Sequence, residues 1–416
     1  MDWAAIWIMV TGALVAGSCA LLGCFLVLRR LAMLGDAISH AVLPGIVLAF
    51  LWTNSTTSLP MFLGAAALGL ITAFVVQTLS QSGVQGDAAI GVTFTSLFAL
   101  GVVLVSGLAR DKDLDLDCVL YGEIAYTPFD MLGPVPRAVV VSGILLLVNA
   151  VVVTLWYKEF KLCAFDPGMA AAVGIPVAAT HYLLMALVSV TTVGAFDSVG
   201  AILVVAMLIV PAATAYLLTD HLVRMLLLAI GLGALASVGG YGMARFLGCS
   251  IAGAMATTSG VLFSLAFLFS PSQGFITRQF AQWRLRRTVL EEDVLLWAAR
   301  RLEAEGTRGF TLKELANGVE RLQPELAGLA GRFAHTGLLA REGERLQLTE
   351  GGVSRARELL RRHRLYETYL GELGYPVDHL HAAADRVEHH LSPALTRALD
   401  EEAHHPERDP QGKPIP

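Results

Sequence analysis

The first two thirds of the sequence contain very little charge. Residues 1–277 hold 9 Lys and Arg and 13 Asp and Glu, whereas residues 278–416 hold 21 and 22. With 16% charged and 55% hydrophobic residues overall, the chain is too apolar for a purely soluble protein. The uneven charge predicts a membrane domain fused to a soluble domain. The formal net charge of −5 indicates no basic surface of the kind that binds nucleic acid.

The sequence also lacks paired cysteines and a nucleotide-binding loop. Its five cysteines are scattered and form no Cys-x-x-Cys motif, which excludes a disulfide scaffold and favours small apolar side chains in helices. No GxxxxGK[ST], HExxH or GxSxG segment occurs. The protein is therefore predicted not to be an enzyme, and any ATP hydrolysis has to come from a partner subunit.

Long apolar segments fill residues 1–277. A bilayer core of about 30 Å needs roughly 20 apolar residues per helix. Nine segments qualify or nearly qualify, and the count falls to eight if the short second segment is a broken or half-inserted helix. The segments are 4–28, 37–53, 60–79, 88–108, 132–156, 178–196, 199–218, 223–246 and 251–270.

Positive loop residues predict the orientation in the membrane. With nine spans, Arg29-Arg30, Lys158 and Lys161, and the arginines after the last span all lie on one face. Such residues favour the cytoplasm, so the N-terminus is expected outside and the C-terminal domain inside. The acidic run 111–117 falls on the outer face, where it gathers cations, meets a partner protein or is simply solvated.

Two ionisable residues in the second span suggest a function, because such residues are costly in lipid. Asp36 and His40 are one helical turn apart and project from the same helix face. A carboxylate and an imidazole suit Mn, Zn or Fe(II) better than Ca or Mg, and Pro44-Gly45 can break the helix at a cavity. The spacing alone leaves two interpretations: a transient site for a transported metal, or an Asp–His hydrogen bond that fastens two helices.

The segment that contains this pair resembles the signature of the membrane permeases of ABC importers for manganese, zinc and iron. It reads RRLAMLGDAISHAVLPG at residues 29–45, and segments 115–124, 165–175 and 199–215 agree with the same family. The resemblance implies a permease of the bacterial plasma (inner) membrane, surrounded by lipid and paired with a second copy or a homologous permease. It implies further an extracytoplasmic metal-binding protein, cytoplasmic ABC ATPase subunits, and a metal path at Asp36 and His40.

A short helix is expected in the cytoplasmic segment between the fifth and sixth spans. Asp166 and Pro167 form an ordinary helix start, preceded by Phe165, and the helix ends at Gly174. Given the resemblance, these four residues are interpreted as part of the coupling helix that docks in a groove of the ATPase subunit. The alternative is an ordinary surface turn.

From about residue 288 the pattern changes to short amphipathic helices with charged faces. Helices are expected near 290–305, 311–319, 323–336 and 350–373, and residues 339–348 alternate as a β-hairpin does. Three helices and a hairpin define a winged helix-turn-helix. The expected fold is thus an all-α polytopic membrane protein of eight or nine transmembrane helices, followed by a cytoplasmic winged helix and a helical metal-binding and dimerisation domain. The expected boundaries are 1–277 for the permease, 278–289 for a linker, 290–350 for the winged helix and 351–416 for the last domain.

Histidines and carboxylates recur at helical spacing near the C-terminus. Eight of the eleven histidines lie at residue 335 or later. His363 and Glu367 are four residues apart, and His381, Asp385 and the pair Glu388-His389 follow at spacings that place them on one side of a helix. Such a face can complete a nitrogen and oxygen metal site with a neighbouring helix. Each residue taken alone fits a solvated charged face better than a metal site.

Residues 290–416 resemble the metal-dependent regulators of the diphtheria-toxin-repressor type, including the manganese-responsive branch. Segments 361–365, 387–392 and 409–416 carry this resemblance. It implies a main metal site at Asp385, Glu388 and His389 with Asp293 as a further ligand, and an ancillary site at His363, Glu367 and His381. Manganese-responsive members have an acidic residue one turn after the position of Asp293, where this chain has Leu296. The metal therefore stays open among Mn, Zn and Fe.

DNA is not expected as a partner. The segment 323–335, which corresponds to a recognition helix, contains one Arg, no Lys, Asn, Ser or Thr, and an acidic residue in its first turn. The domain is predicted instead to sense cytosolic metal in cis, to dimerise, and to damp transport as the cell fills. The alternative is a membrane-tethered, metal-dependent transcriptional regulator whose spans only sense metal.

Overall fold

A computed structural model describes most of the chain, in two compact units divided between Arg278 and Gln279. The described residues are 3–53, 58–108, 123–271, 273–319, 326, 328–329, 331–333 and 336–416. The acidic run 111–117 and Cys118 lie outside them, as does most of the segment 323–335 that was expected to form a recognition helix.

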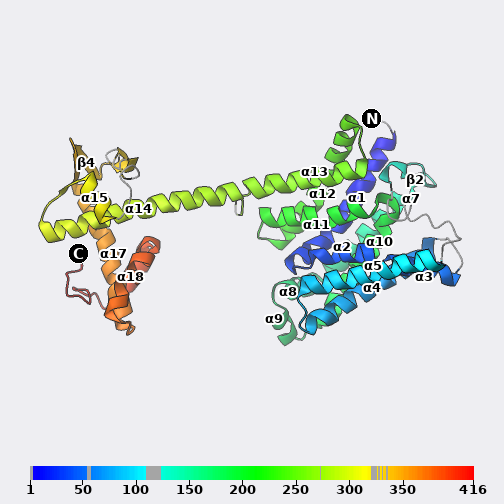
Figure 1. The fold of residues 1–416 in the computed structure, drawn as a ribbon, viewed down its shortest axis with the longest axis horizontal. Helices are drawn as coiled ribbons and strands as arrows, with labels where there is room; N and C mark the ends of the chain where they lie inside the picture. The colour runs from blue at the N-terminus through cyan, green and yellow to red at the C-terminus, as the bar shows by residue number, and fades with distance from the viewer. Residues whose placement is uncertain are drawn as a thin grey trace. The chain divides into compact units, whose positions relative to one another are not determined.

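The first unit is built from apolar helices (Figure 1). Within the described residues, nine helical segments are long and apolar enough to cross a membrane. This confirms the predicted polytopic helical fold. Eight of these segments are single helices: α1 (Trp3–Leu28), α4 (Ser58–Gln81), α5 (Gly86–Leu108), α7 (Arg137–Leu155), α10 (Val177–Val199), α11 (Ala201–Leu218), α12 (Leu222–Leu247) and α13 (Ile251–Phe269).

The second span consists of two helices, α2 (Ala32–Ala41) and α3 (Leu43–Thr53), which meet at Val42. Pro44 explains the break, because it has no amide hydrogen to donate to the carbonyl of His40 and its ring crowds that carbonyl. Gly45 then allows a close approach to α4, since a Cβ at this position would collide with the carbonyl of Gly64. The broken helix therefore stays packed in the unit.

Helix α1 is the centre of the first unit and packs against α12, α11, α7 and α10. Buried polar groups help to join these helices: Asn149 of α7 donates hydrogen bonds to Ser18 Oγ of α1 and to Thr191 Oγ1 of α10, both at 2.8 Å. In a lipid environment such a hydrogen bond is worth about 1 kcal/mol. This network fixes the relative positions of three spans without providing a metal ligand set.

Short elements connect the spans. The 3-10 helix η1 (Ile124–Tyr126) and an antiparallel pair of two-residue strands, β1 (Met131–Leu132) and β2 (Val135–Pro136), precede α7. Helices α8 (Tyr157–Phe165) and α9 (Pro167–Ala172) lie between α7 and α10. Helices α8 and α9 form the segment that the sequence predicted to be cytoplasmic.

The second unit begins within α14 (Phe275–Glu305) and contains a small antiparallel sheet. The sheet has the order β3-β5-β4, and β4 and β5 form the hairpin predicted at 339–348. A capping box between Thr311 and Glu314 starts α15, which follows β3 directly. Leu326, Leu329 and Phe333 lie in the same hydrophobic core as these elements. The bounds are β3 (Gly309–Thr311), α15 (Leu312–Gly318), β4 (Leu339–Glu342) and β5 (Arg345–Leu348).

Helices complete the second unit. Helix α17 (Glu350–Glu372) packs against α18 (Val377–Val387), the 3-10 helix η2 (Glu388–His390) and α19 (Pro393–Glu402). One face of α17 is apolar and buried, but the polar residues His363 and Glu367 are buried as well. Because buried polar groups need partners, this part of α17 is where a site is to be sought.

Candidate metal sites

In the first unit, Asp36 and His40 lie one turn apart on α2. His40 Nε2 is 3.5 Å from Asp36 Oδ1, and both side chains are 43% exposed within this single chain. The His40 ring also lies near the rings of Phe94 and Phe98 on α5, with centroids 6.1 Å apart in each case. The pair is thus at the surface of the unit with its donor atoms accessible.

The rest of α2 explains this orientation. Gly35 lies so close to Leu208 of α11 that a Cβ would collide with that side chain, and Ile38 is fully buried. Ser39 donates a hydrogen bond to the Gly35 carbonyl at 2.9 Å, so it needs no partner outside its helix. With these residues packed inward, the helical period turns Asp36 and His40 away from the core.

The segment predicted to couple to an ATPase forms a capped helix. The Asp166 side chain accepts a hydrogen bond from the Met169 amide at 2.9 Å, Pro167 occupies the first turn, and Gly174 has a positive φ of 89° after the helix end. Phe165 is 60% exposed. Phe165 ends α8, and Met169 on the capped helix α9 is 56% exposed. Exposed apolar side chains on two short helices are suited to docking on another protein.

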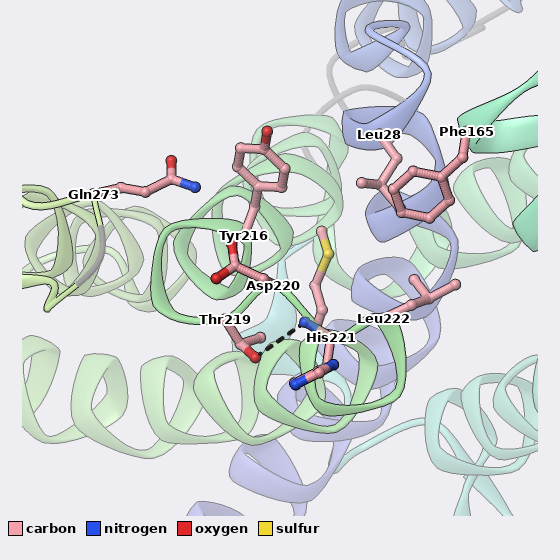
Figure 2. A pocket seen from close by; sticks show the side chains of 9 residues that line it. Leu28, Phe165, Tyr216, Thr219, Asp220, His221, Leu222 and Gln273 are labelled. Carbon is pink, nitrogen blue, oxygen red and sulfur yellow. Dashed lines mark hydrogen bonds between the residues drawn. The ribbon is translucent and has the colours of Figure 1, made fainter. Parts of the chain in front are cut away.

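Phe165 also lines a cavity of about 270 Å³ in the first unit. Figure 2 shows it beside Leu28 at the end of α1 and near the loop that joins α11 to α12, where the His221 amide donates to Thr219 Oγ1. The end of α8 is therefore next to the ends of three spans. The lining residues are Leu28, Phe165, Tyr216, Thr219, Asp220, His221, Leu222, Met225 and Gln273.

In the second unit, His363 and Glu367 of α17 meet His381 of α18. Glu367 Oε1 is 3.0 Å from His363 Nε2 and 2.8 Å from His381 Nδ1, and the two histidine nitrogens are 3.0 Å apart. The side chains of His363 and Glu367 are only 3% and 2% exposed. Two imidazoles and a carboxylate at these distances can hold a transition-metal ion.

A second group joins α14 to η2. His389 Nε2 is 3.2 Å from Asp293 Oδ1 and 3.6 Å from Glu388 Oε1, and its Nδ1 is 2.9 Å from Glu292 Oε2. Hydrogen bonds to Asp293 and Glu292 raise the pKa of His389 to about 10. Without a metal, this imidazole therefore carries a proton at neutral pH, which a bound ion has to displace.

His363 connects the two groups. Its Nδ1 lies 2.6 Å from Glu388 Oε2 and 3.5 Å from Asp385 Oδ1. Among the described residues, three trios of donors can therefore hold a metal: His363 with Glu367 and His381, Asp293 with Glu388 and His389, and His363 with Asp385 and Glu388. All seven residues expected from the sequence are members of these trios. The sequence grouped Asp385 with Glu388 and His389, whereas the structure groups it with Glu388 and His363.

The protonation of His363 follows from its neighbours. Burial alone would lower its pKa, but hydrogen bonds to Glu367 and Glu388 outweigh burial and raise the pKa to about 9. Burial would likewise raise the pKa of Glu367, but the hydrogen bond from His363 lowers it to about 2. The metal-free cluster is therefore held together by a protonated imidazole between carboxylates.

Sequence reasoning missed two residues of this cluster, Glu292 and Arg300. Glu292 is nearly buried between His389 and Arg355, whose Nη2 lies 3.3 Å from Glu292 Oε1. Arg300 Nη2 lies 3.3 Å from both His363 Nε2 and Asp385 Oδ1. The available signal was their position on α14, because Arg300 follows Asp293 by seven residues and therefore lies on the same helix face.

The two units thus define a membrane permease joined to a metal-binding regulatory domain. Residues 2–270 match the model of the ABC 3 transport family, and residues 349–416 match that of the iron dependent repressor, metal binding and dimerisation domain. The chain belongs to the ABC 3 transport family and is a multi-pass membrane protein. It is a transporter subunit.

Similar proteins cover the permease unit or more. The chain is 52% identical to the manganese transport system membrane protein MntD of Bacillus subtilis over 68% of its own length and 97% of that protein. It is 39% identical to the zinc transport system membrane protein TroD of Treponema pallidum over 85% and 98%, respectively. Among solved structures, PsaBC from Streptococcus pneumoniae in complex with Fab matches with a TM-score of 0.57 and 31% identity, over 67% of this chain and 96% of that one.

Proposed function

We propose that this protein is the permease subunit of an ATP-driven importer of divalent transition metal in the bacterial plasma membrane. Manganese is the first candidate, because a manganese permease is 52% identical over nearly its whole length, and zinc and iron(II) are the alternatives. The C-terminal unit lies in the cytoplasm, as the positive loop residues favour. The metal ion is the cargo of the first unit and the regulatory ligand of the second.

The observation that carries the proposed transport path is the Asp36–His40 pair. Two charged or polar donors lie 3.5 Å apart on a transmembrane helix, and both are half-exposed at the surface of the unit. Exposure to lipid would be costly, so a second permease copy or homologue that covers this face would line a polar path. A pair of donors also binds weakly enough to release an ion, as conduction requires.

Energy is supplied by other subunits. A cytoplasmic ABC ATPase docks at Phe165, which ends α8, and at Asp166, Pro167 and Gly174 around α9. Movement of this segment reaches the ends of α1, α11 and α12, which line the same cavity as Phe165 in Figure 2. An extracytoplasmic metal-binding protein delivers the ion at the other face. Support for both partners comes from family membership and from the capped, apolar surface of α9.

The second unit acts as a sensor. Cytosolic metal binds the donors on α14, α17, α18 and η2, orders the domain, and damps transport as the cell fills. The donors fit this role because imidazole and carboxylate groups from four different elements converge there. A metal bound among them links elements that are far apart in sequence, and such a link stabilises the folded domain.

Uptake of radioactive manganese into vesicles with the complete complex tests the transport role. We expect Asp36→Ala and His40→Ala to abolish uptake, and Asp87→Asn, which changes an exposed carboxylate at the start of α5, to leave it unchanged. Uptake that persists in both alanine variants would overturn the proposed path. Zinc and iron(II) as competitors then identify the preferred ion.

Truncation after Gln279 tests the sensor role. With high metal inside the vesicles, the truncated permease is expected to import faster than the full chain, and with low internal metal at the same rate. Equal rates at high internal metal would contradict regulation by the second unit but would leave the transport role intact.

A further inference from the structure

Arg300 places a cation among the metal donors of the second unit. Its Nη2 donates to Asp385 Oδ1 at 3.3 Å and lies 3.3 Å from His363 Nε2. These two atoms belong to two of the three donor trios. A metal ion bound by His363 Nε2 would lie within about 2.1 Å of that nitrogen. The guanidinium and the ion would therefore be close neighbours of like charge.

The position of Arg300 follows from α14. Asp293, Leu296 and Arg300 are spaced by three and four residues and share one helix face. Asp293 reaches the His389 group, whereas Leu296 is buried and offers no donor. The helix thus contributes a carboxylate to one group of donors and a guanidinium to the other.

The guanidinium is held loosely. The Arg300 side chain is 38% exposed and its partner Asp385 is 45% exposed, in contrast to the buried His363. The hydrogen bond to Asp385 measures 3.3 Å, longer than a strong charge-assisted hydrogen bond, and the 3.3 Å contact with the protonated His363 brings like charges together. Arg300 can therefore withdraw into solvent without leaving a buried charge behind.

We propose that Arg300 is a tethered competitor of the regulatory metal: in the metal-free domain it donates to Asp385 and places its positive charge beside His363, and it withdraws when an ion binds. This proposal rests on the sensor role of the second unit. Arg300 weakens the affinity of the donors on α17 and α18 and so raises the cytosolic metal concentration at which the sensor responds. It is a positioning residue rather than a ligand, because guanidinium has no lone pair to offer.

Direct metal binding tests the proposal. The full chain is purified with Asp36→Ala and His40→Ala, so that bound metal reports the second unit, and is dialysed against increasing Mn²⁺ with elemental analysis of the bound ion. Arg300→Gln removes the charge. Arg301→Gln is the matched control, because Arg301 pairs with Glu305 and Glu314 outside the donor cluster. Arg300→Lys keeps the positive charge but lacks the planar, forked guanidinium group.

We expect Arg300→Gln to lower the half-saturating Mn²⁺ concentration about tenfold or more, Arg300→Lys to lower it less than threefold, and Arg301→Gln to match the parent chain. Equal or weaker binding by Arg300→Gln than by Arg301→Gln overturns the proposal while the sensor role stands. If the parent chain and all three variants fail to bind Mn²⁺ in the second unit, both the proposal and the sensor role are wrong. Thermal unfolding of each chain without metal identifies a folding defect in Arg300→Gln, in which case Arg300→Met, which also removes the charge but keeps an unbranched stem, decides: binding no tighter than the control overturns the proposal.

Discussion

The two candidate metal sites differ in the number and the burial of their donors. The membrane unit offers one carboxylate and one imidazole, both half-exposed. The second unit offers seven donors on four elements, and His363, Glu367 and Glu388 among them are nearly fully buried. A site through which an ion passes has to release it, whereas a site that senses an ion has to hold it long enough to change a structure. The difference in donors fits the two tasks proposed for these sites.

Removal of the Asp36–His40 pair is the strongest test of whether the two sites have separate roles. Asp36→Ala with His40→Ala should lower manganese uptake by more than a hundredfold, because no other donor pair in a described span replaces it, and should leave metal retention by the second unit unchanged. Uptake and retention are measured on the same preparation by isotope counting and by elemental analysis after gel filtration. Loss of both quantities would show that the two sites are not separate.

Removal of Glu388 is the corresponding test for the second unit. Glu388 contributes to two of the three donor trios and its carboxylate is nearly buried. Glu388→Gln should weaken Mn²⁺ retention by about a hundredfold, while uptake at low internal metal stays normal. Glu401→Gln is the control, because this exposed residue of α19 is no member of a trio. Normal retention in Glu388→Gln would exclude the proposed donor set.

The pH dependence of metal binding tests the donors of the second unit. His363 and His389 have pKa values raised to about 9 and about 10 by their carboxylate neighbours, so both are protonated at pH 7 in the metal-free domain. A metal has to displace each proton, and affinity for the second unit should rise as pH rises from 6 to 8, by about tenfold per pH unit for each histidine bound. Calorimetry in buffers of different ionisation enthalpy counts the released protons. An affinity independent of pH would contradict this assignment.

Local patterns predict most of the fold and part of the sites. The spans follow from apolar length, the break near Val42 from Pro44-Gly45, and the closeness of His363 to Glu367 from their four-residue spacing. The partners of Asp385 and the roles of Glu292 and Arg300 do not follow from spacing. These contacts join α14 and α17 to α18 and η2, and tertiary packing of this kind leaves no periodic signal in one sequence.

The smallest expected effect concerns the cap of α9, which belongs to neither site. Asp166→Ala removes the hydrogen bond to the Met169 amide, and loss of such a cap costs about 1 kcal/mol of local stability. Helix α9, which follows Phe165 directly, should then fray at its start, and ATP-driven uptake should fall a few-fold while metal retention by the second unit stays the same. Ser250→Ala, which removes the cap of α13, is the matched control and should leave uptake unchanged. Equal losses in the two variants would mean that α9 contributes only stability, and coupling to the ATPase would have to be sought at another cytoplasmic segment.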